Sequence, residues 1–231
     1  MVLGRATMTV SGKQLLLEAA LRLTSSNRSL DSLGIRELAR EAGLNPNTFY
    51  RHFTNIDDLG LTAIHQLAAK LRQPLRDLRR EAASRAEGGD HAGGPALFGI
   101  NLGRGRRVCH QTVVLFFDFV AGNPQAIMLG VRELQGPSAV LREALHRVIS
   151  ELATDMAEDI IEFELLPKSV DAQAIEQVAK LITRNLLQMS LDYINQPEQR
   201  DSIRALAEEQ VVMLFTGAMV LHEAGQLKLP V

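Results

Sequence analysis

Apolar residues recur at helical spacing along most of this chain. Near the amino end, Leu16, Ala19, Ala20 and Leu23 lie three or four residues apart, which predicts a helix with one buried stripe over about residues 11–26. Alternating β-branched residues, which would indicate half-buried strands, are scarce, and no strand is expected. The pattern therefore predicts an all-α protein.

Further stripes, separated by proline, glycine and capping residues, predict six helices in the later part of the chain. We expect them at residues 55–86, 108–122, 124–135, 138–165, 172–195 and 198–224. Pro74 lies inside the first of these and predicts a kink or a local break. Residues 87–107 are rich in glycine and lack periodicity, so we expect a mobile loop there.

The stretch IRELAREAGLNPNTFYRHF, residues 35–53, contains two short helical patterns. Gly43 breaks the first pattern, because glycine reaches the left-handed conformation without steric cost. Asn45 can cap the second helix, with Pro46 at its first position, where a missing N–H has no effect. Phe49 and Phe53 are four residues apart and are expected to face inward. Two helices joined by a short glycine-containing turn indicate a helix-turn-helix.

Charge is distributed unevenly between the two parts of the 231-residue chain. Residues 1–86 carry 13 basic and 8 acidic side chains, a charge of +5, and the rest carry 12 and 19, a charge of −7. A basic first part is expected to bind an anionic partner, although the whole chain has a net charge of −2.

Membrane insertion, disulfide bonding and catalysis find little support in the sequence. Cys109 is the only cysteine, and the most apolar run, residues 113–120, is far shorter than the ~20 residues of a membrane span. The six histidines have no metal-ligand spacing, and the acidic residues of 151–164 are expected to form a solvated helix face rather than a metal or carboxylate site. We expect a cytoplasmic protein that is not an enzyme and needs no cofactor or metal.

The sequence resembles the TetR family of transcriptional repressors over about residues 15–61, with SLGIRELAREAGLNPNTFYRHF as the most specific stretch. The resemblance implies a helix-turn-helix DNA-binding domain at residues 1–54 and a helical effector-binding and dimerisation domain at residues 55–231. It also implies a homodimer, formed through the last two helices, that binds a double-stranded DNA operator with two half-sites.

The resemblance assigns DNA-binding roles by position. Asn47 and Thr48 are expected to contact base edges, and Arg51 a phosphate or a guanine. Tyr50 and His52 are expected to bind the backbone, with ordinary surface positions as the alternative. The remaining backbone contacts are assigned to Arg36, Thr54 and Asn55.

Two further stretches, FYRHFTNIDDLGLT and NPQAIMLGVRELQGPS, resemble repressors of unsaturated fatty-acid synthesis, which sense acyl-CoA or acyl-carrier thioesters. A small hydrophobic effector, such as an acyl-CoA, is therefore expected in the second domain. Candidates for lining its site are Phe116, Phe119, Val120, Met128, Leu129, Met156, Ile160, Leu186 and Met189, although ordinary core is the more common role of such residues in a helical domain.

Two cationic sites could hold the headgroup of such an effector. Arg132 could bind a phosphate, could pair with Glu133 of another subunit, or could be exposed. Arg104, Arg106 and Arg107 form the second candidate, with a solvated loop as its alternative.

The chain also departs from the family pattern. Many members carry a lysine two residues into the connecting helix, where this chain has the sequence NIDD at residues 55–58. The glycine-rich segment 87–107 has no counterpart in the subgroup. Three hypotheses therefore remain open: a ligand-gated repressor, a DNA-binding dimer without a small-molecule effector, and a helical enzyme or interaction module.

Overall fold

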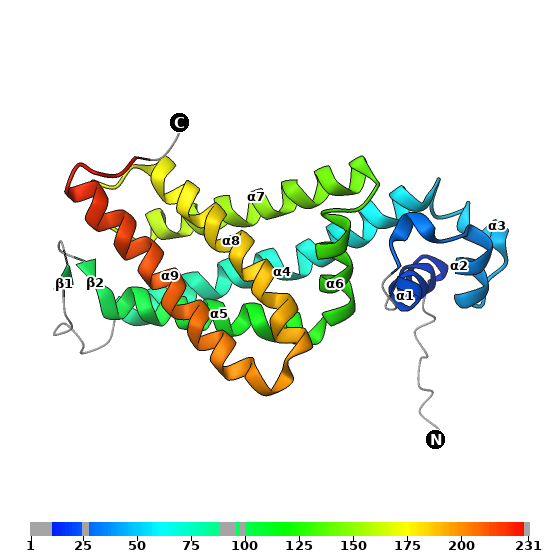
Figure 1. Ribbon diagram of the computed structural model, residues 1–231, viewed down its shortest axis with the longest axis horizontal. Helices are drawn as coiled ribbons and strands as arrows, with labels where there is room; N and C mark the ends of the chain where they lie inside the picture. The colour runs from blue at the N-terminus through cyan, green and yellow to red at the C-terminus, as the bar shows by residue number, and fades with distance from the viewer. Residues whose placement is uncertain (1–10, 25–27, 88–95, 98–99, 229–231) are drawn as a thin grey trace, which may run out of the picture. The chain divides into compact units, whose positions relative to one another are not determined.

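The computed structural model describes residues 11–24, 28–87, 96–97 and 100–228. Its helices are α1 (Gly12–Thr24), α2 (Ile35–Glu41), α3 (Pro46–Phe49), α4 (Ile56–Glu87), α5 (Leu102–Gly122), α6 (Pro124–Glu133), α7 (Ala139–Glu162), α8 (Ala172–Asn195) and α9 (Arg200–Glu223). Two 3-10 turns, η1 (Leu30–Ser32) and η2 (Pro197–Gln199), and two short strands, β1 (Ala96–Leu97) and β2 (Ile100–Asn101), complete the described chain. Figure 1 shows these elements, and the predicted all-α class is confirmed.

Three features differ from the sequence-based expectations. The strands β1 and β2 pair antiparallel, although no strand was expected. Helix α5 begins at Leu102, so residues 102–107 are helical rather than loop, while residues 88–95 and 98–99 lie outside the described part. Helix α4 continues through Pro74 without the local break, while the kink stays a prediction. Pro74 and Lys70 are both exposed, so water can bind the Lys70 carbonyl that Pro74 leaves without a helical N–H partner.

The chain forms two compact units. The first contains the described residues up to Gln66 together with Met128–Leu145, and the second contains Leu67–Ile127 and the described residues from His146 onward. In this division the end of α6 and the start of α7 belong with the amino-terminal helices, because Leu129 and Leu141 lie in the apolar core of the first unit.

The first unit has a single apolar core. Leu16, Leu38, Phe49 and Leu59 are fully buried in it, and Leu141 of α7 is equally inaccessible. A Cβ on Gly60 would lie only 2.8 Å from a methyl carbon of Leu141, so glycine permits the close approach of α4 and α7 in this unit. Burying four such side chains contributes on the order of 6–12 kcal/mol before chain entropy is counted.

Two polar residues at the end of α6 tie it to the first unit. The buried Glu133 carboxylate accepts the backbone N–H of Leu30 at 2.8 Å through Oε1. Arg132 Nη1 donates to the backbone oxygens of Thr24 and Arg28 at 2.8 and 2.9 Å. Arg132 is therefore placed on backbone carbonyls of the first unit, and Glu133 is too deeply buried to be the partner of an arginine in another subunit.

The second unit is built on α5, α8 and α9, which pack against one another, as Figure 1 shows. Phe117 is fully buried and its ring lies 4.6 Å from that of Tyr193. Arg200 and Arg204 lie over the Tyr193 ring, at 5.0 and 5.3 Å from its centroid. These aromatic and cationic contacts stabilise the end of the unit where η2 joins α8 to α9.

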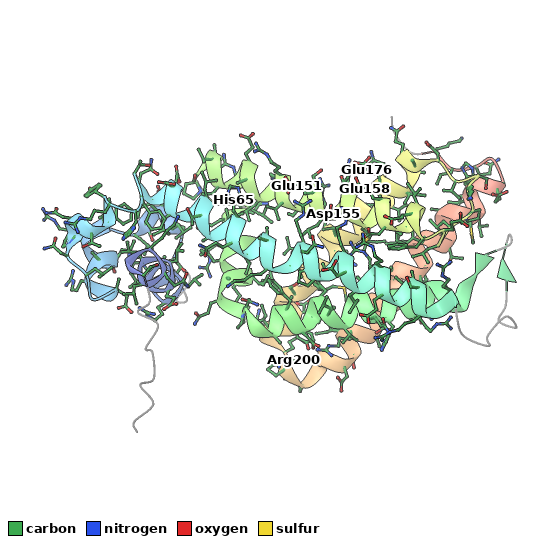
Figure 2. All side chains as sticks on the ribbon, turned by 180° about the vertical axis from the view of Figure 1, so that it is seen from behind. His65, Glu151, Asp155, Glu158, Glu176 and Arg200 are labelled. Carbon is green, nitrogen blue, oxygen red and sulfur yellow. The ribbon has the colours of Figure 1, made fainter. Side chains whose placement is uncertain are left out.

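Ion pairs join α4 to α7 within the second unit. Arg72 binds both oxygens of Asp155 at 2.7 and 3.0 Å, and Glu151 at 2.6 Å. Arg79 Nε donates to Asp159 Oδ2 at 2.7 Å. Figure 2 shows Glu151, Asp155 and Glu158 following one another along α7. Asp155 and Asp159 are buried, so the expectation of a wholly solvated acidic face was wrong.

Candidate nucleic-acid interface and apolar cavity

The turn between α2 and α3 has the local structure that its sequence predicts. Gly43 has a φ of +68°, in the left-handed region. The Asn45 side chain accepts the backbone N–H of Asn47 at 2.9 Å, and Pro46 occupies the first position of α3. Phe49 is fully buried, and its ring lies 5.6 Å from that of Phe53. The inward side of α3 is thereby fixed, which sets the direction of its outward side.

The outward side of α3 and the following turn is polar and exposed. Asn47, Arg51 and His52 are exposed, and Tyr50 retains 63% of its accessible surface. Thr48 is half-buried. The Arg51 guanidinium makes no hydrogen bond or ion pair with any residue that the structure describes. An exposed cation, amide and phenol on one helical face form a surface suited to base edges and phosphates.

The first turn of α1 lies beside this surface. A Cβ on Gly12 would lie 3.0 Å from His52 Nε2, and Lys13 Nζ lies 5.4 Å from the centroid of the Phe53 ring. Lys13 is therefore a further cation near the predicted interface, to which sequence reasoning gave no role. The sequence predicts that Lys13 lies near the start of the first helix. It does not predict that Lys13 lies beside Phe53, which is forty residues later in the sequence.

Thr54 and Asn55 have internal partners at the start of α4. The N–H and hydroxyl of Thr54 donate to Asp58 Oδ2 at 2.9 and 3.2 Å, and Asn55 Oδ1 accepts the Asp58 N–H at 2.8 Å. These bonds cap α4 and use the groups expected to bind phosphate. Arg36, on α2, is exposed. A phosphate bound by the Thr54 N–H and hydroxyl would therefore compete with the Asp58 carboxylate, whereas Asn55 uses only its Oδ1, as an acceptor from the Asp58 N–H.

A second candidate site is an apolar cavity of about 110 Å³ inside the second unit. Residues of α4, α5, α7, α8 and α9 line it, with Leu165 and Leu166 following α7. Its polar wall groups belong to Arg79, Arg106, Cys109, Thr112 and Thr216. Burial raises the pKa of the Cys109 thiol to about 12. The cavity is therefore apolar with a few polar groups, which is typical of small-molecule sites.

The structure brings together only part of the predicted ligand-binding set. Met156, Ile160 and Leu186 line the cavity. Phe116, Phe119, Val120 and Met189 belong to the core of the second unit and do not line it. Met128, Leu129 and Arg132 belong to the first unit, and Leu129 is part of its core. Arg79, Thr112, Phe215 and Thr216 were missed, because core and cavity positions share the same helical periodicity.

The basic residues at the start of α5 are partly engaged in ion pairs. Arg106 binds both carboxylate oxygens of Glu209 on α9, at 2.6 and 3.2 Å. His110 Nδ1 lies 2.8 Å from Oε1 of the neighbouring Glu208. Arg106 is thus fixed at the cavity wall by α9 rather than held in a solvated loop.

The first unit therefore contains a helix-turn-helix with an exposed polar surface, and the second unit contains an apolar cavity. Residues 16–61 match the sequence model described as "Bacterial regulatory proteins, tetR family". The amino-terminal domain of this chain is therefore a TetR-family domain, and the described chain has the TetR-like fold.

Solved structures of such regulators share this fold at low sequence identity. A transcriptional regulator from Rhodococcus sp. Rha1 is 17% identical with a TM-score of 0.64, over 90% of this chain and 97% of the other. The fatty acid degradation regulator FadR from Bacillus halodurans is 14% identical with a TM-score of 0.59, over 91% and 98%. FadR from Bacillus subtilis, solved in complex with stearoyl-CoA, is 14% identical with a TM-score of 0.55, over 88% and 97%.

Among the described residues, no single helix has the length and apolar character needed to cross a membrane. Helices α5 and α6 meet that test only when they are taken together, and the chain bends between them.

Proposed function

We propose that this protein is a transcriptional repressor that binds a palindromic DNA operator as a homodimer and responds to a fatty-acyl ligand. The observation that carries the proposal is the outward surface of α3 and the turn after it, where Asn47, Tyr50, Arg51 and His52 are exposed while Phe49 is fully buried. Two such faces, related by a twofold axis, would read two half-sites of a palindrome.

The Arg51→Ala variant tests this face. We expect it to weaken operator binding by roughly 10- to 100-fold, since a good contact to a base or phosphate contributes about 1–3 kcal/mol. Arg80→Ala is the matched control, because Arg80 is also exposed but lies on α4 in the second unit. Mobility shift of a DNA fragment selected by the wild-type protein measures both variants. Equal affinities for wild type and Arg51→Ala would refute the assignment.

Dimerisation is supported by an apolar stripe on α9. Leu206, Met213, Leu214, Val220 and Leu221 are between 37% and 59% exposed. Their spacing of seven, one, six and one residues places them along one side of the helix. A Cβ on Gly217 would meet nothing within 4 Å, so this side is also open. On α8, Leu181 is 52% exposed. Exposed apolar surface of this kind is typical of protein interfaces.

The Met213→Asp variant tests the proposed dimer. A carboxylate buried against the second copy should weaken dimerisation by about 100-fold, on the order of 3 kcal/mol. Ile161→Asp is the control, because Ile161 is a similarly exposed apolar residue on α7. Light scattering should find a dimer for wild type and Ile161→Asp and a monomer for Met213→Asp. A monomeric wild type would contradict the proposed dimer.

The fatty-acyl effector is supported by the apolar cavity and by the stretches of sequence that resemble fatty-acid regulators. The fold shared with FadR from Bacillus subtilis, solved with stearoyl-CoA, points the same way. Native mass spectrometry of the purified protein tests it, and a co-purified acyl compound is the expected result. Other small hydrophobic compounds, or the absence of any effector, are the alternatives that this measurement separates.

A further inference from the structure

One buried cation at the cavity wall, Arg79, has hydrogen-bond donors that its carboxylate partner does not use. Arg79 is 4% exposed, and both Nε and Nη2 are directed at the same oxygen, Asp159 Oδ2. Its third nitrogen, Nη1, makes no hydrogen bond with any residue in the described part of the chain. A guanidinium has five N–H donors, so Arg79 can serve a ligand without releasing Asp159.

The surrounding charges decide which ligand this donor favours. The ion-pair network contains three cations, Arg72, Arg76 and Arg79, and four acidic groups on α7, listed as Glu151, Asp155, Glu158 and Asp159. Arg106, the other cation at the cavity wall, is neutralised by Glu209. The cavity therefore has an available donor but no surplus positive charge. A second carboxylate beside Arg79 would face the Asp159 charge at close range in a poorly solvated region.

We infer that the cavity takes a neutral apolar molecule with one hydrogen-bond acceptor, and that Arg79 Nη1 donates to that acceptor. The carbonyl of a fatty-acyl ester or thioester has this chemistry, whereas a free fatty carboxylate does not. The inference rests on the proposed acyl effector and narrows it to the esterified form. Burial disfavours charge in this region: it raises the pKa of the Asp159 carboxyl and lowers the pKa of the Arg79 guanidinium. A further charged group is therefore disfavoured beside them.

Cys109 provides a direct readout, because it lines the cavity and is the only cysteine of the chain. The purified full-length protein is treated with N-ethylmaleimide, and labelling is followed by mass spectrometry with methyl octanoate or octanoate present. We expect methyl octanoate to slow labelling at a concentration at least about tenfold below that needed for octanoate. Equal or stronger protection by octanoate would overturn the inference.

Variants of the ion pair test the role of Arg79 itself. The double variant Arg79→Met with Asp159→Leu replaces the pair by apolar side chains of similar size, which proteins often tolerate. We expect protection by methyl octanoate to require about tenfold more ester in this variant. Arg72→Gln alters the ion-pair network away from the cavity wall. It should leave the concentration of methyl octanoate needed for protection unchanged. An unchanged requirement in a folded double variant would also overturn the inference.

The outcomes separate this inference from the proposed function. Protection by octanoate alone would be consistent with a fatty-acid effector and would refute the inference that the effector is an ester or thioester. Protection by neither compound would overturn both the inference and the acyl effector, and operator binding by the Arg51 surface would then stand by itself. The comparison of the two compounds on the wild-type protein needs no variant, so a double variant that fails to fold does not prevent the test.

Discussion

Phe49→Ala is expected to abolish operator binding by unfolding the first unit. Phe49 is fully buried between α1, α2 and α4, and its ring contacts those of Phe53 and Tyr50. Removing a buried phenylalanine ring costs about 3–5 kcal/mol, a large part of the stability of a small helical unit. Hydrogen exchange of the backbone amides in α1 and α2 should show the loss directly.

Tyr50→Ala is the matched control, since Tyr50 is the aromatic residue next to Phe49 but is the exposed C-cap residue of α3. Tyr50 is 63% exposed, so its removal should change the free energy of unfolding by less than about 1 kcal/mol. We expect this variant to remain folded and to bind the operator more weakly through a lost backbone contact. If Phe49→Ala kept normal amide protection and operator affinity, the inward placement of this helix face would be wrong.

Asp159→Ala should destabilise the second unit by about 3–5 kcal/mol, because it leaves the guanidinium of Arg79 buried without its partner. Glu158→Ala is the control on the same helix. Glu158 also pairs with an arginine, Arg76, but its side chain is 55% exposed, and its removal should cost less than about 1 kcal/mol. Urea denaturation followed by circular dichroism compares the two, and equal losses would contradict the buried pair.

Protonation of Asp159 also makes the stability of the second unit depend on pH, with a definite sign. Burial raises the pKa of the Asp159 carboxyl, so the folded chain holds this proton to a higher pH than the unfolded chain does. The contribution of protonation at this site to the free energy of unfolding is fully present below the unfolded pKa. It falls as pH rises through the folded pKa. Exposed carboxylates such as Glu37, whose pKa is lowered by its hydrogen bonds with Arg28, act in the opposite direction.

Local chemistry made the helix-turn-helix predictable from sequence. The left-handed Gly43, the Asn45 cap and the inward Phe49 each depend on neighbours within a few residues, and all three are confirmed. Helix α8 was likewise expected at residues 172–195, since Asp171 caps it and its apolar stripe is regular.

Contacts between distant segments could not be predicted in the same way. Arg132 was one candidate for a ligand headgroup, with pairing to another subunit or exposure as alternatives, but its partners include the carbonyls of Thr24 and Arg28, more than 100 residues earlier in the sequence. The arginines of α4 at positions 72, 76 and 79 do repeat at helical spacing, as do the acids at 151, 155, 158 and 159 on α7. That complementary spacing was the available signal for the ion-pair network. It could be used only with the knowledge that α4 and α7 pack together.

The cavity shows the same limit for apolar residues. A helical stripe predicts that a residue is buried, but the same stripe supplies both core and cavity walls. Met156 lines the cavity, whereas Val120 is fully buried in the surrounding core, and the sequence made both residues candidates for ligand contact or for core.

If the proposed function is right, an acyl ligand changes operator binding by a dimer of this protein. The most direct test is fluorescence anisotropy of a labelled DNA duplex, selected by the protein from a random pool, with and without methyl octanoate. We expect a selected palindrome with half-sites about one helical turn apart, bound by two copies of the chain, and a shift of at least about fivefold in affinity when the ester is present. An asymmetric single site bound by one copy, with an affinity that the ester leaves unchanged, would contradict the proposed function.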